Sequence, residues 1–170
     1  MKNQKTALVF DLDETVVNSQ HRTPCFPDGT LNLEQYIAKH TRENVFLDTL
    51  LPLARTMQNA INSGYTVAIL TARDMAQADY DFLSLHGIKP KHIYSRDKCK
   101  TKKHYQMRDG EYKVAWLQKI AKKVTSKHVI MFDDSKVVKK AMRQAGIVCI
   151  CAHKVNKRLA LQTLLKCFLF

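Results

Sequence analysis

Two pairs of aspartates are the residues of this sequence best suited to chemistry. Asp11 and Asp13 follow the first apolar run of the chain, and Asp133 and Asp134 follow a later one. Aspartate disfavours strands and is costly to bury as an ion, so carboxylates at such positions need a cation or a catalytic task. Hard oxygen ligands with few nitrogen or sulfur donors beside them favour Mg²⁺. For one pair alone, a solvated turn after a strand is the alternative, but the two pairs together predict a magnesium site that handles phosphate.

The spacing of Asp11 and Asp13 separates two catalytic tasks. At the end of a strand, residues two apart let one carboxylate attack a phosphorus in line while the other reaches the leaving oxygen. Thr71 ends another apolar run and adds a hydroxyl group. In a parallel sheet these strand ends lie at one edge, where ligands bind. The sequence therefore predicts phosphoryl transfer at that edge.

The elements that must position these residues alternate between strands and helices. Short apolar runs predict strands at residues 6–10, 65–70, 92–95, 128–132 and 147–151. Helical spacing of apolar residues predicts helices at 33–39, 47–63, 75–86, 109–124, 135–145 and 156–168, with Gly64, Gly87 and Gly146 as stops. This alternation predicts an α/β fold, a three-layer doubly wound parallel sheet in a single domain that spans residues 1–170.

Residues 18–46 interrupt this alternation. They contain Pro24, Pro27 and an Asp28-Gly29 turn before the short helix expected at 33–39. Their position after the first strand predicts a small cap or flap insertion over the end of that strand.

The net charge of +13 is concentrated in the second half of the chain. Residues 1–97 carry 10 Lys and Arg against 11 Asp and Glu, whereas residues 98–170 carry 18 against 4. Residues 96–108 form a basic loop that contains Lys98, Lys100, Lys102 and Lys103. Such a field favours a polyanionic partner, although a solvated basic surface is the alternative.

Other classes of protein are disfavoured by the composition. No run approaches the roughly 20 apolar residues of a membrane span, and the start of the chain does not resemble a secretory signal. The five cysteines form no C-x-x-C pair, which disfavours a zinc site or a disulfide framework. We therefore expect a cytoplasmic protein with reduced thiols and no membrane partner, whereas its oligomeric state is not predicted.

The motifs jointly resemble those of the haloacid dehalogenase (HAD) phosphatase superfamily. They are D-L-D-E-T from Asp11, the apolar run that ends in Thr71, a downstream Lys113, and F-D-D-S around Asp133. The resemblance implies that Asp11 is a nucleophile that forms an aspartyl-phosphate. It implies that Asp13 protonates the leaving oxygen and then activates water, while Thr71 and Lys113 hold phosphoryl oxygens.

The same resemblance implies a Mg²⁺ site and a HAD-like Rossmann-type sheet. The metal ligands would be the Asp11 carboxylate, the Asp13 backbone carbonyl and Asp133. Asp134 would orient a metal-bound water or a neighbouring side chain. A HAD fold that binds nucleic acid without turnover is a less favoured alternative, because the catalytic residues are all present.

Within the superfamily, the chain looks most similar to the phosphatase half of phage polynucleotide kinase-phosphatase. Thr71-Ala72-Arg73 stands in place of Ser-Gly-Arg, and Asp109 precedes Lys113 after the basic loop. The resemblance implies a polynucleotide 3′-phosphatase, with Arg73, Asp109 and the four loop lysines binding a phosphorylated nucleic acid.

The chain also departs from that pattern, which keeps a second substrate class open. Ala72 replaces a glycine, Leu12-Asp13-Glu14 replaces Val-Asp-Gly, and the chain contains no kinase P-loop. Acid phosphatases that act on nucleotides also begin with Asp-Leu-Asp-Glu-Thr. A nucleoside monophosphate phosphatase, with a nucleotide as substrate, is therefore the alternative.

Overall fold

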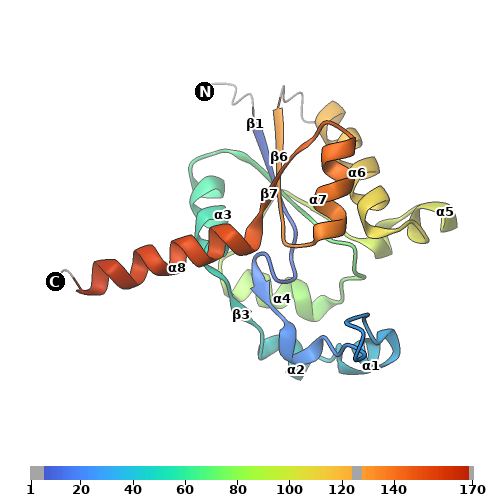
Figure 1. Ribbon diagram of the computed structural model, residues 1–170, viewed down its shortest axis with the longest axis horizontal. Helices are drawn as coiled ribbons and strands as arrows, with labels where there is room; N and C mark the ends of the chain where they lie inside the picture. The colour runs from blue at the N-terminus through green and yellow to red at the C-terminus, as the bar shows by residue number, and fades with distance from the viewer. Residues whose placement is uncertain (1–5, 124–127, 169–170) are drawn as a thin grey trace.

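The computed structural model describes residues 6–123 and 128–168, and a five-stranded parallel sheet forms its centre (Figure 1). The strands are β1 (Thr6–Phe10), β4 (Thr66–Leu70), β5 (His92–Tyr94), β6 (His128–Asp133) and β7 (Val148–Cys151). Their order is β5-β4-β1-β6-β7, and every neighbouring pair is parallel. This arrangement confirms the predicted doubly wound α/β fold and places β1 at the centre.

Helices cover both faces of the sheet, which explains why β1 is apolar from Ala7 to Phe10. One face carries α3 (Pro52–Asn62), α4 (Gln77–Leu85) and α8 (Ala152–Phe168), and the other carries α6 (Asp109–Lys123) and α7 (Lys136–Gln144). Phe10 packs in the first of these layers and Val9 in the second, and neither is exposed. Burial of each such side chain contributes roughly 1.5–3 kcal/mol, so the strand that carries Asp11 is held firmly.

Several helix boundaries differ from the expected ones. Residues 47–51 are not helical, because β3 (Thr49–Leu50) pairs with β2 (Val17–Asn18) and Pro52 then starts α3. Pro is favoured at a first helical position, where its missing N–H is not needed. The final helix starts at Ala152, directly after β7, rather than at Asn156. Gly64 and Gly146 have φ of 77° and 68°, so the predicted left-handed stops are present there.

The basic loop, residues 96–108, connects β5 to α6. The basic loop contains a 3₁₀ turn at Arg96–Lys98 and a short helix, α5 (Lys102–Tyr105), whose first turn is capped by Thr101. The expected end of the preceding long helix at Val124 lies outside the described residues. None of the helices in the described ranges has both the length and the apolar character needed to cross a bilayer.

The irregular segment after β1 is flanked in the chain by β2 and β3, which form a two-stranded antiparallel pair. It contains α1 (Leu33–Lys39), at the predicted position, and α2 (Arg42–Phe46), which was not predicted. Figure 1 shows α1 and α2 at the end of the molecule away from the N-terminus, beyond the carboxyl end of β1. Helix α1 has no buried residue, whereas Val45 of α2 is buried in the core layer formed by α3 and α4. The insertion therefore lies at the edge of the sheet where the aspartates emerge.

Candidate active site

A buried lysine joins the ends of the two central strands. Asp11 follows β1 and remains in the sheet through its N–H, which donates to the Phe132 carbonyl at 2.9 Å. Asp133 ends β6, and Lys113 reaches both carboxylates from the first turns of α6. Its ammonium lies 2.7 Å from Asp11 Oδ1 and 2.8 Å from Asp133 Oδ2. The structure therefore brings together three of the predicted residues at the carboxyl edge of the sheet.

Burial makes the charges of this trio depend on one another. Burial opposes the charge of the Lys113 ammonium, but the carboxylates of Asp11 and Asp133 outweigh it and raise the pKa of Lys113. Burial also raises the pKa of Asp11, and the Lys113 ammonium acts against that shift. Lys113 therefore favours the ionised, nucleophilic form of Asp11, in opposition to the burial that disfavours it.

A second cation would fit beside this lysine. Asp11, Asp133 and Asp134 each offer one oxygen, and these oxygens all lie within 4.8 Å of one another. The Asp133 carboxylate is oriented by the backbone N–H of Ser135, which donates to its Oδ1 at 2.9 Å. Burial and the charge of Asp133 raise the pKa of Asp134, a repulsion that a divalent cation would relieve. This oxygen-only donor set suits Mg²⁺.

The Asp13 side chain lies outside this oxygen cluster and faces a different group of residues. Its Oδ1 accepts a hydrogen bond from Ser19 Oγ at 2.7 Å and one from Arg73 Nη1 at 2.8 Å. The Asp13 side chain is 29% exposed, so a leaving group could reach it. The expected contribution of Asp13 to a metal site through its backbone carbonyl stays a prediction.

Arg73 is placed differently from the expectation that it binds substrate phosphate. Its Nη1 contacts Asp13 and its Nη2 donates to Asp79 Oδ1 at 2.6 Å, and the Arg73 side chain is 8% exposed. Burial opposes its charge, but Asp13 and Asp79 outweigh that effect and raise the pKa of Arg73. Both terminal nitrogens are thus directed to carboxylates of the chain. In this arrangement Arg73 positions Asp13.

The insertion contributes to the same network through residues that sequence reasoning did not identify. His40 Nε2 lies 2.9 Å from Asp79 Oδ2, and Tyr36 is among the groups that raise the pKa of Arg73. Arg22, only 1% exposed, donates to both oxygens of Asp48 at 2.9 and 2.7 Å. Arg22 and Asp48 are 26 positions apart with no recognisable pattern between them, so the sequence alone could not have paired them. Polar side chains of the insertion therefore help to fix Arg73, which holds Asp13.

We expect Asp79→Asn to destabilise the fold at neutral pH by about 2 kcal/mol, because the hydrogen bonds that Asp79 makes to Arg73 and His40 involve charged groups. Burial would raise the pKa of Asp79, but the bonds from His40 and Arg73 outweigh it and lower it. A carboxyl whose pKa is lowered on folding contributes stability above its unfolded-state pKa, and that stability is lost as pH falls through the folded-state value. Urea unfolding of both proteins from pH 7 to pH 3 should show the difference shrink towards acid pH. Glu34→Gln, which removes an exposed carboxylate of α1, is the control, and an equal loss in both variants would contradict the network.

Thr71 lies where the sequence places it, at the end of β4 beside β1. It is 1% exposed, and its N–H donates to the Tyr94 carbonyl at 2.9 Å, which extends the pairing with β5. The Thr71 hydroxyl accepts a hydrogen bond from the N–H of Arg73 at 3.4 Å. Because the hydroxyl is the acceptor in this contact, its own hydrogen remains available for another acceptor.

The basic loop does not take part in the carboxylate cluster. Asp109 pairs with Arg96 at 2.6 Å, and the Lys98 ammonium lies 4.9 Å from the centre of the Tyr80 ring. Lys100 is exposed on the segment before α5, and Lys102 and Lys103 are exposed in its first turn. Within the described ranges no ion pair connects these lysines to Asp11, Asp13 or Asp133. Their predicted role in binding substrate stays untested, and Asp109 acts here as a partner for Arg96.

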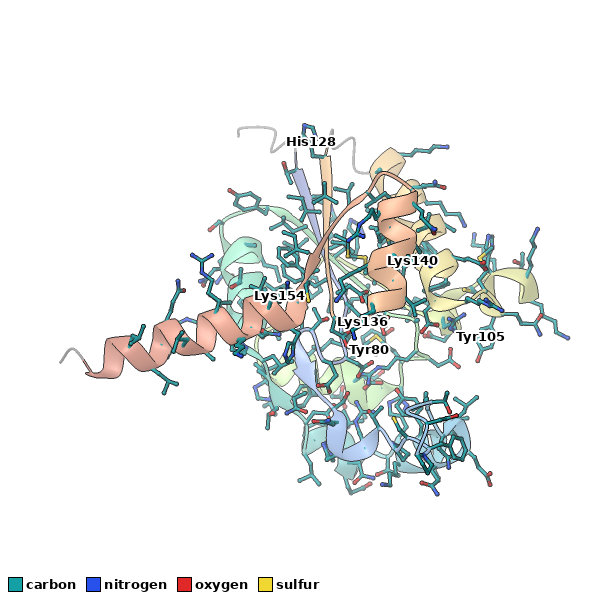
Figure 2. All side chains as sticks on the ribbon, in the orientation of Figure 1. Tyr80, Tyr105, His128, Lys136, Lys140 and Lys154 are labelled. Atoms are coloured by element: carbon teal, nitrogen blue, oxygen red, sulfur yellow. The ribbon has the colours of Figure 1, made fainter. Side chains whose placement is uncertain are left out.

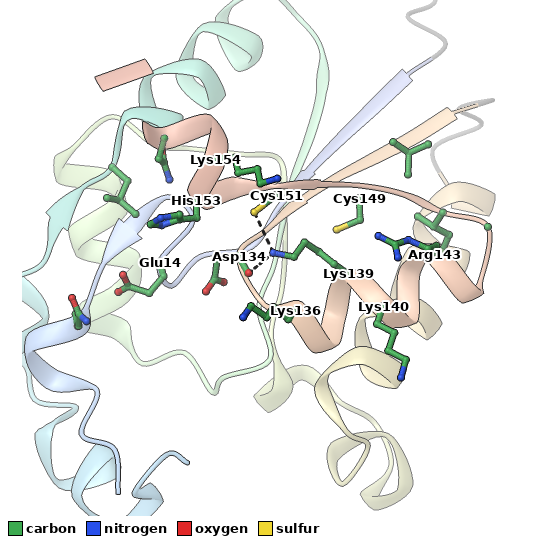
Figure 3. A pocket seen from close by; sticks show the side chains of 16 residues that line it. Glu14, Asp134, Lys136, Lys139, Lys140, Arg143, Cys149, Cys151, His153 and Lys154 are labelled. Carbon is green, nitrogen blue, oxygen red and sulfur yellow. Dashed lines mark hydrogen bonds between the residues drawn. The ribbon is translucent and has the colours of Figure 1, made fainter. Parts of the chain in front are cut away.

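A wide groove opens from the metal-binding side of this edge (Figure 3). Its volume is about 1310 Å³, and Asp134 and Glu14 stand at one end of it. Its other charged residues come from α7 and the start of α8, which the sequence analysis did not connect to the site. The groove therefore adjoins the catalytic carboxylates at Asp134, and the insertion contributes Gln20 to its lining.

Comparison with known proteins identifies a family for the whole chain. The family model described as "Bacteriophage T5 5′-deoxynucleotidase" matches residues 1–167. The 5′-deoxynucleotidase of Escherichia phage T5 is 31% identical over 170 residues, which cover 91% of this chain and 70% of that protein. The nucleotidase alternative is thus favoured over the main interpretation, because this family match gives no support for a 3′-phosphatase of nucleic-acid ends.

Solved structures with lower identity share the fold. A haloacid dehalogenase-like hydrolase from Streptococcus pneumoniae has a TM-score of 0.62 at 17% identity, with 89% of this chain and 85% of that chain covered. A chain of the Pnkp1/Rnl/Hen1 RNA repair complex has a TM-score of 0.60 at 19% identity, with 89% of this chain but only 43% of that chain covered. The predicted HAD-like fold is therefore confirmed, and the chain belongs to the bacteriophage T5 5′-deoxynucleotidase family.

Proposed function

We propose that the protein is a Mg²⁺-dependent 5′-deoxynucleotidase, which hydrolyses deoxynucleoside 5′-monophosphates to deoxynucleosides and phosphate. The observation that carries this proposal is the buried Asp11–Lys113–Asp133 trio in a chain whose relative is named a 5′-deoxynucleotidase. The trio supplies a nucleophile and a cation for phosphoryl oxygens. The relative supplies the substrate class.

The residues divide the reaction into two displacements. An oxygen of Asp11 forms a bond to phosphorus as the bond from phosphorus to the 5′ oxygen breaks, and Asp13 gives that oxygen its proton. Asp13 then accepts a proton from water as the water oxygen displaces Asp11 from phosphorus. Ser19 and Arg73 fix the Asp13 carboxylate for both transfers.

The surrounding residues would stabilise the negative charge of the phosphoryl group. Lys113 and the Thr71 hydroxyl would bind its oxygens at the strand ends. Asp11, Asp133 and Asp134 would hold Mg²⁺, which neutralises charge on the phosphate when it is bound. The buried sheet edge keeps these groups in place before substrate arrives.

The proposed substrate class is tested by phosphate release from a matched panel. The panel contains 5′- and 3′-deoxynucleoside monophosphates, 5′-ribonucleoside monophosphates and dodecamers phosphorylated at either end, each with Mg²⁺ and with EDTA. We expect the 5′-deoxynucleotides to have the highest kcat/KM and EDTA to abolish turnover. A higher kcat/KM for a 3′-phosphorylated dodecamer would restore the polynucleotide interpretation.

We expect Asp13→Asn to slow substrates with poor leaving groups far more than aryl phosphates. Protonation matters when the leaving oxygen is strongly basic, as in a nucleotide, and is typically worth about 100 to 10,000-fold. Burst kinetics on p-nitrophenyl phosphate and on a 5′-deoxynucleotide would separate the first displacement from the second. Equal losses in the first displacement would remove Asp13 from the role of general acid.

A further inference from the structure

The groove beside Asp134 is far more basic than a mononucleotide requires. Its basic lining residues are Lys136, Lys139, Lys140, Arg143, His153 and Lys154. Among the residues that the structure describes, the acidic ones in its lining are Glu14 and Asp134, and Asp134 belongs to the carboxylate cluster. A deoxynucleoside monophosphate has a single phosphate, and Lys113 already stands beside the nucleophile that would receive it. The positive charge along the groove is therefore unexplained by the proposed hydrolysis.

Most of these cations are free to meet a ligand. Lys136, Lys140, Arg143 and Lys154 are exposed, and within the described residues none of them forms an ion pair with a carboxylate. Lys139 is the exception, because its ammonium contacts the Asp134 carbonyl and lies 3.2 Å from Cys151 Sγ (Figure 3). Lys139 thus belongs to the groove floor, and the other four cations line its open part.

The spacing of the cations suits a linear chain of phosphates. Lys136, Lys140 and Arg143 lie at positions i, i+4 and i+7 of α7, on one side of the helix, and Lys154 lines the same groove from the start of α8. At about 1.5 Å per residue, the stripe from Lys136 to Arg143 is about 10 Å long. A stripe of this length can contact more than one phosphate of a strand.

The size and lining of the groove favour a strand over a small ligand. Its volume of about 1310 Å³ exceeds the roughly 300–1,000 Å³ of ordinary small-molecule pockets. None of the residues that line it is Phe, Tyr or Trp, so it offers no aromatic platform for bases. Contacts in the groove would therefore be made to the backbone and would not distinguish sequences.

We propose that this groove binds the phosphodiester backbone of single-stranded nucleic acid, independently of base sequence and apart from the hydrolysis of mononucleotides. The basic half of the sequence predicted a polyanionic partner, and the structure brings part of that charge together in the groove, apart from the basic loop. Figure 2 shows Tyr105 of α5 on the far side of α7 from Lys154, so the two basic regions can be tested separately.

The experiment measures fluorescence anisotropy of a labelled single-stranded dodecamer with hydroxyl groups at both ends, which cannot serve as a substrate. A groove variant carries Lys140→Gln, Arg143→Gln and Lys154→Gln, and a matched variant carries Lys100→Gln, Lys102→Gln and Lys103→Gln. Both lose three positive charges from exposed positions. We expect the groove variant to bind at least tenfold more weakly at low salt. Its log-log salt slope should fall by about 2, because each lost contact to a single strand contributes about 0.7.

The other outcomes decide against the groove. An equal or larger loss in the loop variant would place the strand on the basic loop or show that only net charge matters, and wild-type protein that does not bind the dodecamer would also overturn the proposal. Calorimetry with dATP supplies a third arm, because tight triphosphate binding that the groove variant alone loses would make the groove a small-ligand site. The groove variant should keep wild-type kcat/KM for a 5′-deoxynucleotide and a wild-type melting temperature. A parallel fall in kcat/KM would assign the groove to the substrate of the hydrolysis instead.

Discussion

We expect Asp11→Asn to abolish phosphate release from deoxynucleotides and from aryl phosphates alike. The carboxylate that attacks phosphorus is lost, so a good leaving group cannot rescue turnover. Removal of a catalytic nucleophile lowers kcat by on the order of 10⁴-fold or more. The fold should survive, because the amide keeps the shape of the side chain and removes one of the two negative charges beside Lys113.

The control for this variant is Asp81→Asn. Asp81 is a surface carboxylate of α4 that pairs with Arg42, well outside the carboxylate cluster. It should keep its activity, and thermal melting of both variants should lie within a few degrees of the wild type. If Asp11→Asn retained turnover within tenfold of wild type, Asp11 could not be the nucleophile.

Lys113→Met should damage both stability and catalysis, because it leaves two buried carboxylates without their cation. Removal of one partner from a buried ion pair costs about 3–5 kcal/mol. Loss of a positive group that faces the phosphoryl oxygens lowers kcat by on the order of 100-fold or more. The acidic limb of the pH–rate profile should also move to higher pH, because burial raises the pKa of Asp11 and Lys113 opposes that rise. These effects should appear together.

The matched control is Lys122→Met, an exposed lysine on the same helix. It makes the same chemical change without burying a charge, so it should alter neither melting temperature nor pH profile. Unfolding should be measured with EDTA and with Mg²⁺, since a cation held by Asp11, Asp133 and Asp134 would offset part of the lost charge. A stable Lys113→Met protein with an unchanged acidic limb would contradict the role given to Lys113.

Local patterns in the sequence were sufficient to predict the sheet and the catalytic edge. The run before Asp11 is apolar at every position, because β1 is covered on both faces, and this property is visible without a structure. The chemistry of Asp11 and Asp13, and of Asp133 and Asp134 at the end of β6, could also be predicted from their positions in the sequence. The prediction that Lys113 lies near these residues came from the family resemblance, and the structure places it between Asp11 and Asp133.

Long-range pairing could not be predicted in the same way. Arg73 has the position of a phosphate ligand in the motif, but Asp79 and Asp13 occupy its guanidinium in the structure. Asp79 lies only six residues further on, yet nothing in the sequence says that α4 turns it inward. His40 reaches Asp79 across 39 residues from an irregular segment whose path no periodicity describes.

The sequence alone also could not show which positive charges lie close together in the fold. The lysines of residues 98–103 are dense in sequence, so they were the predicted surface for a polyanion. The residues of α7 and α8 are spread over 19 positions, and only the packing of β7 between these helices brings Lys140 and Lys154 to one groove. Charges that are distant in sequence can therefore be recognised as one group only in the fold.

The central claim is that phosphate passes through Asp11, and acid-quenched reactions with a 5′-deoxynucleotide test it most directly. The enzyme is mixed with substrate and Mg²⁺, quenched within milliseconds and digested, and the peptides are analysed by mass spectrometry. We predict one phosphoryl group on the peptide that contains Asp11, formed as fast as the nucleoside is released and absent in Asp11→Asn. Release of nucleoside at the wild-type rate with no phosphorylated peptide, or with the phosphoryl group on another residue, would contradict the mechanism.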